Sequence, residues 1–382
     1  MSLSEVLAQH RVVVCVGSGG VGKTTTSAAL AMHAAILGRR VLCLTIDPAK
    51  RLANSLGLTA MTTEEQLVSP ELFAQAGLVA EGTLSAMMLD TKRTFDELVQ
   101  KYASSPARAK RIFDNRLYQY ISTSLAGTQE YMAMEKLHSV RQSGKYDLIV
   151  LDTPPTTNAL DFLDAPERLV DAIDSPAMRW FAQAFSGVGK LGFGLFGRGA
   201  QMVLKGLAKF TGGDFLEAVA EFIGDINELF GGFTERARQV SSALRGPEVA
   251  FVLVTSPDPL AVQEAIFFAG KLAESGLTQR GTVINRVTPL LAEPPGTPSE
   301  VSAAFAALVQ KSHAGERDPA ALQELLERAL DEDRLRAVTD RGEVERLKAL
   351  TGNRGLYVEV PAFEQDVHDL GALARVASYL VA

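Results

Sequence analysis

One glycine-rich stretch constrains the fold of this chain more than any other feature of its sequence. Residues 17–24 read Gly-Ser-Gly-Gly-Val-Gly-Lys-Thr, which matches the phosphate-loop pattern G-x-x-x-x-G-K-[ST]. A β-branched apolar run, RVVVCV, precedes the stretch, and an alanine-rich run, SAALAMHAAILG, follows it. This order predicts a strand, a loop and a helix, in which backbone N–H groups and the helix N-terminus bind a polyphosphate. The sequence therefore predicts a site for a nucleoside triphosphate.

Polar residues in and beyond this loop have the chemistry that such a site needs. Lys23 would reach the β- and γ-phosphates, and the Thr24 hydroxyl would be a ligand of Mg²⁺. Asp152 ends the apolar run YDLIVL, where an acidic residue completes the magnesium shell. Asp47 ends the run VLCLTI and could orient or deprotonate an attacking water, although Asp-Pro is also ordinary turn chemistry. The residues expected to surround the phosphates are Gly19, Gly20, Val21, Gly22, Lys23, Thr24 and Thr25.

The other apolar runs predict the fold class. Further runs lie at 146–152, 249–255, 281–287 and 357–361, and none alternates polar with apolar residues. Such strands are typical of a parallel sheet that is covered by helices on both faces. We therefore expect an α/β fold with a doubly wound, mostly parallel sheet of the P-loop NTPase kind, formed by residues 1–160 and 246–382.

Residues 161–245 predict an inserted helical subdomain, because no strand-like run occurs there. The stretch 176–233 holds nine of the 18 phenylalanines, together with methionines and a glycine-rich segment at 187–199. Flexible, apolar helices of this kind suit binding of a hydrophobic client, but ordinary core packing explains the same residues. A Pro-rich loop at 290–300 precedes a charged amphipathic helix, expected over roughly 301–350, whose charges mark a solvated face.

Composition excludes several other classes of protein. The 382 residues include 38 basic and 45 acidic side chains, a net charge of −7, so we expect no nucleic-acid partner. The chain shows no secretory signal and no uncharged apolar run long enough to cross a bilayer. Both cysteines, Cys15 and Cys43, lie in strand-like runs, which indicates buried thiols in a reducing compartment. We therefore expect a cytoplasmic protein that meets membranes only indirectly.

Five segments, taken together, resemble one family. They are GSGGVGKTT, IDPAKRLANSLG, GTQEYMAMEKL, LDTPPTTNALDFL and INRV, in that order along the chain. In this they are similar to the ArsA/Get3 family of dimeric P-loop ATPases. The resemblance implies a Mg·ATP-dependent ATPase whose homodimer opens and closes with the nucleotide cycle.

The resemblance also implies roles for particular residues. Residues 47–57 correspond to switch I, in which Asp47 activates water, and residues 152–157 to switch II. Asn285 corresponds to the asparagine that reads adenine, and residues 255–259 to the loop near the base. Residues 127–130 align loosely with a segment that bridges towards the dimer partner. In Get3 proteins, the helices inserted after switch II shield the transmembrane tail of a tail-anchored client, which would place that client on 176–233.

Departures from the family pattern leave other functions open. Ser18 replaces the family's signature lysine, which reaches across the dimer to the partner's phosphates, so hydrolysis could be slow. The chain lacks cysteines around 288–300, and so lacks the zinc clamp of eukaryotic Get3 proteins. The alternatives are a slow ATP-dependent switch or scaffold of the MinD/ParA kind, the ATPase subunit of an arsenite or anion pump, and a phosphoryl-transfer enzyme of the dethiobiotin-synthetase type.

Overall fold

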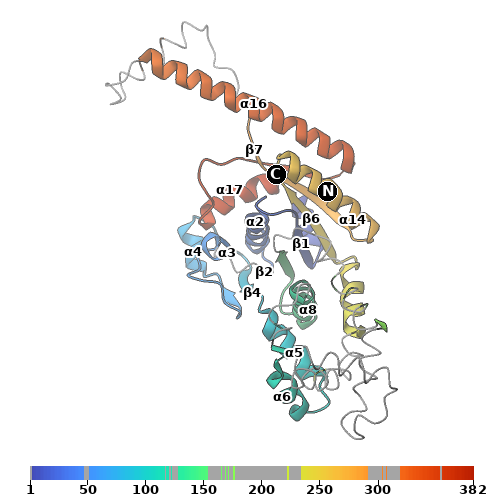
Figure 1. Ribbon diagram of the computed structural model, residues 1–382. Helices are drawn as coiled ribbons and strands as arrows, with labels where there is room; N and C mark the ends of the chain where they lie inside the picture. Colours follow the sequence, from blue (N-terminus) through green and yellow to red (C-terminus); the bar gives the residue numbers. More distant parts are fainter. Residues whose placement is uncertain are drawn as a thin grey trace.

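A computed structural model describes residues 2–46, 51–116, 128–153, 234–290, 319–352 and 355–382, together with isolated positions between these ranges. Within this part of the chain, a single eight-stranded sheet forms the centre of the molecule, in the order β3-β4-β2-β5-β1-β6-β7-β8 (Figure 1). The strands are β1 (Val12–Val16), β2 (Arg40–Thr45), β3 (Gln66–Leu67), β4 (Thr83–Met88), β5 (Leu148–Asp152), β6 (Val249–Thr255), β7 (Gln279–Val287) and β8 (Tyr357–Pro361).

The sheet confirms the predicted parallel architecture. β1 lies between β5 and β6 and pairs with both in parallel, and the remaining neighbours are also parallel except for β3 and β4. Every residue of β1, β5 and β6 is buried, which explains why these runs do not alternate. Six strands were expected from the sequence. The short β3 and the strand β4, TLSAMM, were missed because β4 holds no β-branched residue after Thr83.

Helices cover both faces of the sheet, as a doubly wound fold requires. On one face α2 (Lys23–Ile36) packs with α1 (Leu3–Gln9), α3 (Arg51–Ser55), α4 (Pro70–Gln75) and α17 (Leu370–Leu380). The opposite face is covered by α5 (Thr91–Tyr102), α6 (Pro106–Asp114), α8 (Thr128–Ser143), α14 (Pro259–Glu274), α16 (Pro319–Thr351) and a helix at 234–244. Side chains of β1 alternate between the two cores, since Val13 and Cys15 enter the first and Val12 and Val14 the second.

Two helix boundaries differ from the sequence expectation. α2 begins at Lys23, four residues before the run SAALAMHAAILG, so Lys23, Thr24 and Thr25 form its first turn. α16 begins at Pro319, and its C-terminal half packs on the sheet through Val344 and Leu347. The expected helical residues 301–318 lie outside the described residues, apart from two isolated positions.

Most of the predicted insert also lies outside the described residues. Its last helix, 234–244, packs into the core through Ala237, Val240 and Leu244. Phe222 is 8% exposed and belongs to the same apolar cluster, so ordinary packing accounts for this phenylalanine. Among the helices that the structure describes, none combines the length and the apolar character needed to cross a membrane.

Candidate nucleotide-binding site

The glycine-rich loop follows β1, and three of its glycines have positive φ; at two of them, a side chain would also meet a neighbouring strand. Gly17 has φ +151° and Gly22 has φ +96°, both in the region that L side chains rarely adopt. A Cβ atom at Gly17 would lie 2.0 Å from the carbonyl oxygen of Val254, and one at Gly22 would lie 2.1 Å from Nδ2 of Asn285. The loop therefore fits between β6 and β7 only because these two side chains are absent.

The N-terminus of α2 is open to a ligand. Its N-cap residue is Gly22, and no side chain caps the helix. By contrast, carboxylates cap α5, α14 and α17 through Asp90, Asp258 and Asp369. The first-turn N–H groups of α2 thus remain for an anion, which the helix dipole also favours.

Lys23 is buried within the loop that it serves. Its side-chain nitrogen donates hydrogen bonds to the carbonyl oxygens of Gly17, at 2.9 Å, and of Ser18, at 2.7 Å. The residue is only 5% exposed, so these bonds satisfy a charge that burial would otherwise penalise. The ammonium group therefore lies against the backbone of the loop, and its contact with a phosphate stays a prediction. Ser18 contributes its backbone here but no charge.

Thr24 and Asp152 meet at the C-terminal ends of β1 and β5. The Thr24 hydroxyl donates to Oδ2 of Asp152 at 2.9 Å, and Thr45 donates to the same oxygen at 3.0 Å. Asp152 is fully buried. A hydroxyl beside a carboxylate supplies the hard oxygen donors that Mg²⁺ prefers, so this pair fits the predicted metal. The sequence did not identify Thr45, because a threonine at the end of a strand is common and does not by itself indicate a binding site.

Two consecutive residues of β7 donate hydrogen bonds to carbonyl groups of the loop. Nδ2 of Asn285 donates to the carbonyl oxygen of Val21 at 2.9 Å, and Nη1 of Arg286 donates to that of Gly20 at 3.2 Å. These contacts fix the orientation of the carbonyl groups of Val21 and Gly20. Adenine recognition by Asn285 stays a prediction, and Arg286 was not singled out from the sequence.

Other predicted switch residues are only partly described. Asp47 lies outside the described residues, as do 154–157 and Gly127. Thr153, the second residue of the expected switch II, donates from its hydroxyl to the carbonyl oxygen of Cys15 at 2.8 Å, which ties the start of that segment to β1.

The cysteines are confirmed as core residues. Cys15 and Cys43 are both fully buried and free. Burial raises the pKa of the Cys15 thiol to about 12 and that of Cys43 well above its usual value. Protonated, inaccessible thiols are poor ligands for a soft metalloid.

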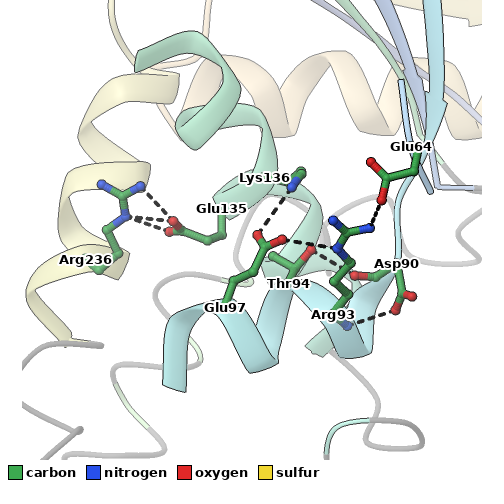
Figure 2. Close-up of polar contacts among 8 residues, drawn as sticks. All are labelled: Glu64, Asp90, Arg93, Thr94, Glu97, Glu135, Lys136 and Arg236. Atoms are coloured by element: carbon green, nitrogen blue, oxygen red, sulfur yellow. Dashed lines mark hydrogen bonds and ion pairs between the residues drawn. The ribbon is translucent and has the colours of Figure 1, made fainter. Parts of the chain in front are cut away.

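A buried ion pair joins α8 to the helix at 234–244 (Figure 2). The guanidinium group of Arg236 donates to both oxygens of Glu135 at 2.7–2.9 Å, and each side chain is 4% exposed. On the other side of α8, Lys136 contacts Glu97 of α5 at 3.3 Å. Figure 2 also shows Arg93 of α5 paired with Glu64 and Glu97 at the surface. α8 thus connects the last helix of the predicted insert with α5.

The doubly wound sheet, the glycine loop after β1 and the Thr24–Asp152 pair define a P-loop NTPase. The family model of the anion-transporting ATPase (ArsA) matches residues 10–296, three quarters of the chain. This chain therefore belongs to the ArsA/Get3 family of ATPases, as the sequence motifs indicated.

Curated relatives carry the name ATPase GET3. The protein from Malassezia globosa is 27% identical over 305 residues, which are 78% of this chain and 79% of the relative. The protein from Chaetomium globosum is 26% identical over 303 residues, with the same shares covered. A shorter match to the protein from Aspergillus terreus reaches 31% identity over 163 residues, 41% of this chain and 43% of that protein.

Proposed function

We propose that this ATPase binds Mg·ATP at the loop between β1 and α2. The observation that carries the proposal is the contact between Thr24 and the buried Asp152, beside the enclosed ammonium group of Lys23. Lys23 binds the β- and γ-phosphates, and the N–H groups from Gly19 to Thr25 surround them. Thr24 and Asp152 would hold Mg²⁺, which would supply positive charge to neutralise the charge that develops on the phosphates. Asp47, which the resemblance assigns to switch I, accepts the proton of the attacking water.

The protein works as a homodimer that closes on ATP and opens after hydrolysis. Two observations support this proposal: the chain contains a single phosphate loop, and it belongs to a family whose resemblance implied a dimeric ATPase. Ser18 provides no cation for the partner's phosphates, so hydrolysis is slow relative to family members that have the lysine. Ser18→Lys should therefore raise the turnover number, and an unchanged rate would show that another cation already acts there.

The nucleotide cycle gates the binding of a hydrophobic client, such as a tail-anchored membrane protein, by residues 176–233. The relatives named GET3 and the phenylalanine-rich composition of this stretch support the client class. The connection through α8 supports the coupling. The first residues of α8, from Thr128, fall within the segment expected to bridge to the partner. Glu135, in the middle of α8, pairs with Arg236 in the last helix of the predicted insert (Figure 2). A movement of α8 would thus be transmitted to the base of the insert.

Co-purification with a membrane protein that has one C-terminal transmembrane segment tests the client. Wild type should capture it, and a Phe215→Ser, Phe230→Ser double variant should not, provided that the variant still binds ATP. Phe222 is left unchanged because it is buried in the core cluster and its loss would destabilise the fold. No capture by wild type in any nucleotide state would reduce the function to an ATP-dependent switch with another partner.

A further inference from the structure

Arg286 has an unusual backbone for a residue with a long side chain. Its φ is +63°, and it is the non-glycine residue with positive φ in the described part of the chain. An L residue in this region costs about 1–2 kcal/mol, so the surrounding structure must enforce it. The pairing of β7 with β8 shifts register between Asn285 and Val287, so Arg286 is the extra residue of a β-bulge.

The bulge has a geometric consequence for the phosphate loop. In a regular strand, neighbouring side chains point to opposite faces, so Asn285 and Arg286 could not both reach one loop. With the bulge, Asn285 donates to the carbonyl oxygen of Val21 and Arg286 to that of the preceding residue, Gly20. Two adjacent carbonyl groups of the loop are therefore held by β7.

The end of β7 is fixed immediately after the bulge. Beyond it, the N–H of Thr288 donates to Oδ2 of Asp340 on α16 at 2.8 Å, and the N–H of Ala362 donates to the carbonyl oxygen of Val287 at 2.9 Å. Arg286 is exposed and borders a cleft of about 300 Å³ between the Ser256–Pro259 loop and α16. A guanidinium group has five N–H donors, and its contact with Gly20 uses one of them.

We propose that Arg286 is a positioning residue for ATP binding. Its bond to Gly20 holds the middle of the loop so that the N–H groups face the phosphates, and its positive charge, next to the loop, supports binding of an anion. The strained bulge brings Arg286 to the loop. This inference rests on the proposed nucleotide site.

Three substitutions at Arg286 separate the effect of its charge on ATP binding from the effects of its backbone strain and of a destabilised fold. Arg286→Gly removes the side chain and relieves the backbone strain, Arg286→Asn removes the charge but tolerates positive φ, and Arg286→Lys keeps the charge. We expect the first two to weaken ATP binding about tenfold, as for the loss of a charge-assisted hydrogen bond. Arg286→Lys should stay within threefold of wild type, and kcat should change less than KM in all three.

Thermal unfolding without nucleotide distinguishes function from structure. Arg286→Gly should unfold at the same temperature as wild type or higher, because its backbone strain is gone. Unchanged ATP affinity in Arg286→Gly would overturn the proposal. A lower unfolding temperature that accompanies the loss of affinity would also overturn it, because Arg286 would then be structural.

Two further variants complete the experiment. Arg336→Gln removes an arginine on the α16 wall of the same cleft that makes no contact with the loop among the described residues, and should leave ATP affinity unchanged. An equal loss of ATP affinity in Arg336→Gln would mean that positive charge near the cleft supports binding, and not the contact between Arg286 and Gly20. That result would overturn the proposal. Lys23→Ala tests the nucleotide site itself. If Lys23→Ala binds ATP as tightly as wild type does, the proposed function fails. If Lys23→Ala loses ATP binding while Arg286→Gly keeps the ATP affinity of wild type, only the role of Arg286 is refuted.

Discussion

The Thr24 hydroxyl lies 2.9 Å from Oδ2 of Asp152, although 128 positions separate the two residues in the sequence. The contact joins the first turn of α2 to the end of β5, where we propose that a magnesium ion binds. Thr45 holds the same oxygen from β2, so three elements determine where this carboxylate lies.

Asp152→Asn should weaken binding of Mg·ATP by about tenfold to a hundredfold, as for other groups that orient a metal ligand. The amide keeps the shape of the side chain but loses the negative charge. Titration of a fluorescent ATP analogue with and without Mg²⁺ measures the effect. Binding without Mg²⁺ should be unchanged or tighter, since a negative charge near the phosphates is gone. An unchanged response to Mg²⁺ would remove Asp152 from the metal site.

Asp47→Asn should separate binding from hydrolysis. If Asp47 accepts the proton of the attacking water, kcat should fall by about 10²–10⁴-fold. The dissociation constant of ATP should stay within a few-fold of wild type, because Lys23 and the loop remain. Phosphate release and ATP titration on the same sample measure both quantities, and undiminished turnover would assign the general base elsewhere.

The Glu135–Arg236 pair should be essential for the stability of the base of the insert. Arg236→Met leaves a buried carboxylate without its partner, which should cost about 3–5 kcal/mol. Urea unfolding of wild type and variant measures the loss. Arg93→Met is the matched control from the same region (Figure 2), and should change the stability far less, because that ion pair is exposed to solvent. Equal effects would mean that burial of the pair does not matter.

His138 should make stability depend on pH. Burial, and then the charges of Arg236, Arg141 and Lys101, lower its pKa from 6.5 to about 4. The folded protein therefore disfavours the proton that the unfolded chain accepts, so stability is full above about pH 6.5 and falls as the pH drops towards 4. The loss attributable to this residue is on the order of 3 kcal/mol at most.

The difference between His138→Met and wild type isolates this contribution. The variant should lose less stability between pH 7 and pH 4.5 than wild type does, while the exposed His368→Gln should behave as wild type. If the free energy of unfolding fell equally with pH in wild type and in His138→Met, His138 would not be a source of the pH dependence.

The two thiols should be unreactive in the folded state. Burial raises the pKa of Cys15 to about 12, so neither accessibility nor ionisation favours attack. A thiol reagent at pH 8 should label neither cysteine until denaturant is added. Arsenite should then leave the ATPase rate unchanged, whereas stimulation that disappears in a Cys15→Ala, Cys43→Ala variant would favour the pump subunit.

The sequence by itself determined the parts of the site that depend on neighbours along the chain. The loop at 17–24 and the six apolar strands follow from local patterns of glycine, β-branched and apolar residues, and the structure confirms those strands and their parallel order. β4 was missed because alanine and methionine suit a helix as well as a strand.

Tertiary structure decided what depends on residues far apart in the chain. Thr45 meets Asp152 across 107 positions, Arg236 meets Glu135 across 101, and Arg286 meets Gly20 across 266. The pairing of β2 with β5, the packing of α8 and a bulge in β7 produce these contacts in turn, and none of the three leaves a periodic pattern in the sequence. Long-range contacts arise from the order of strands and the docking of helices, which local propensity does not encode.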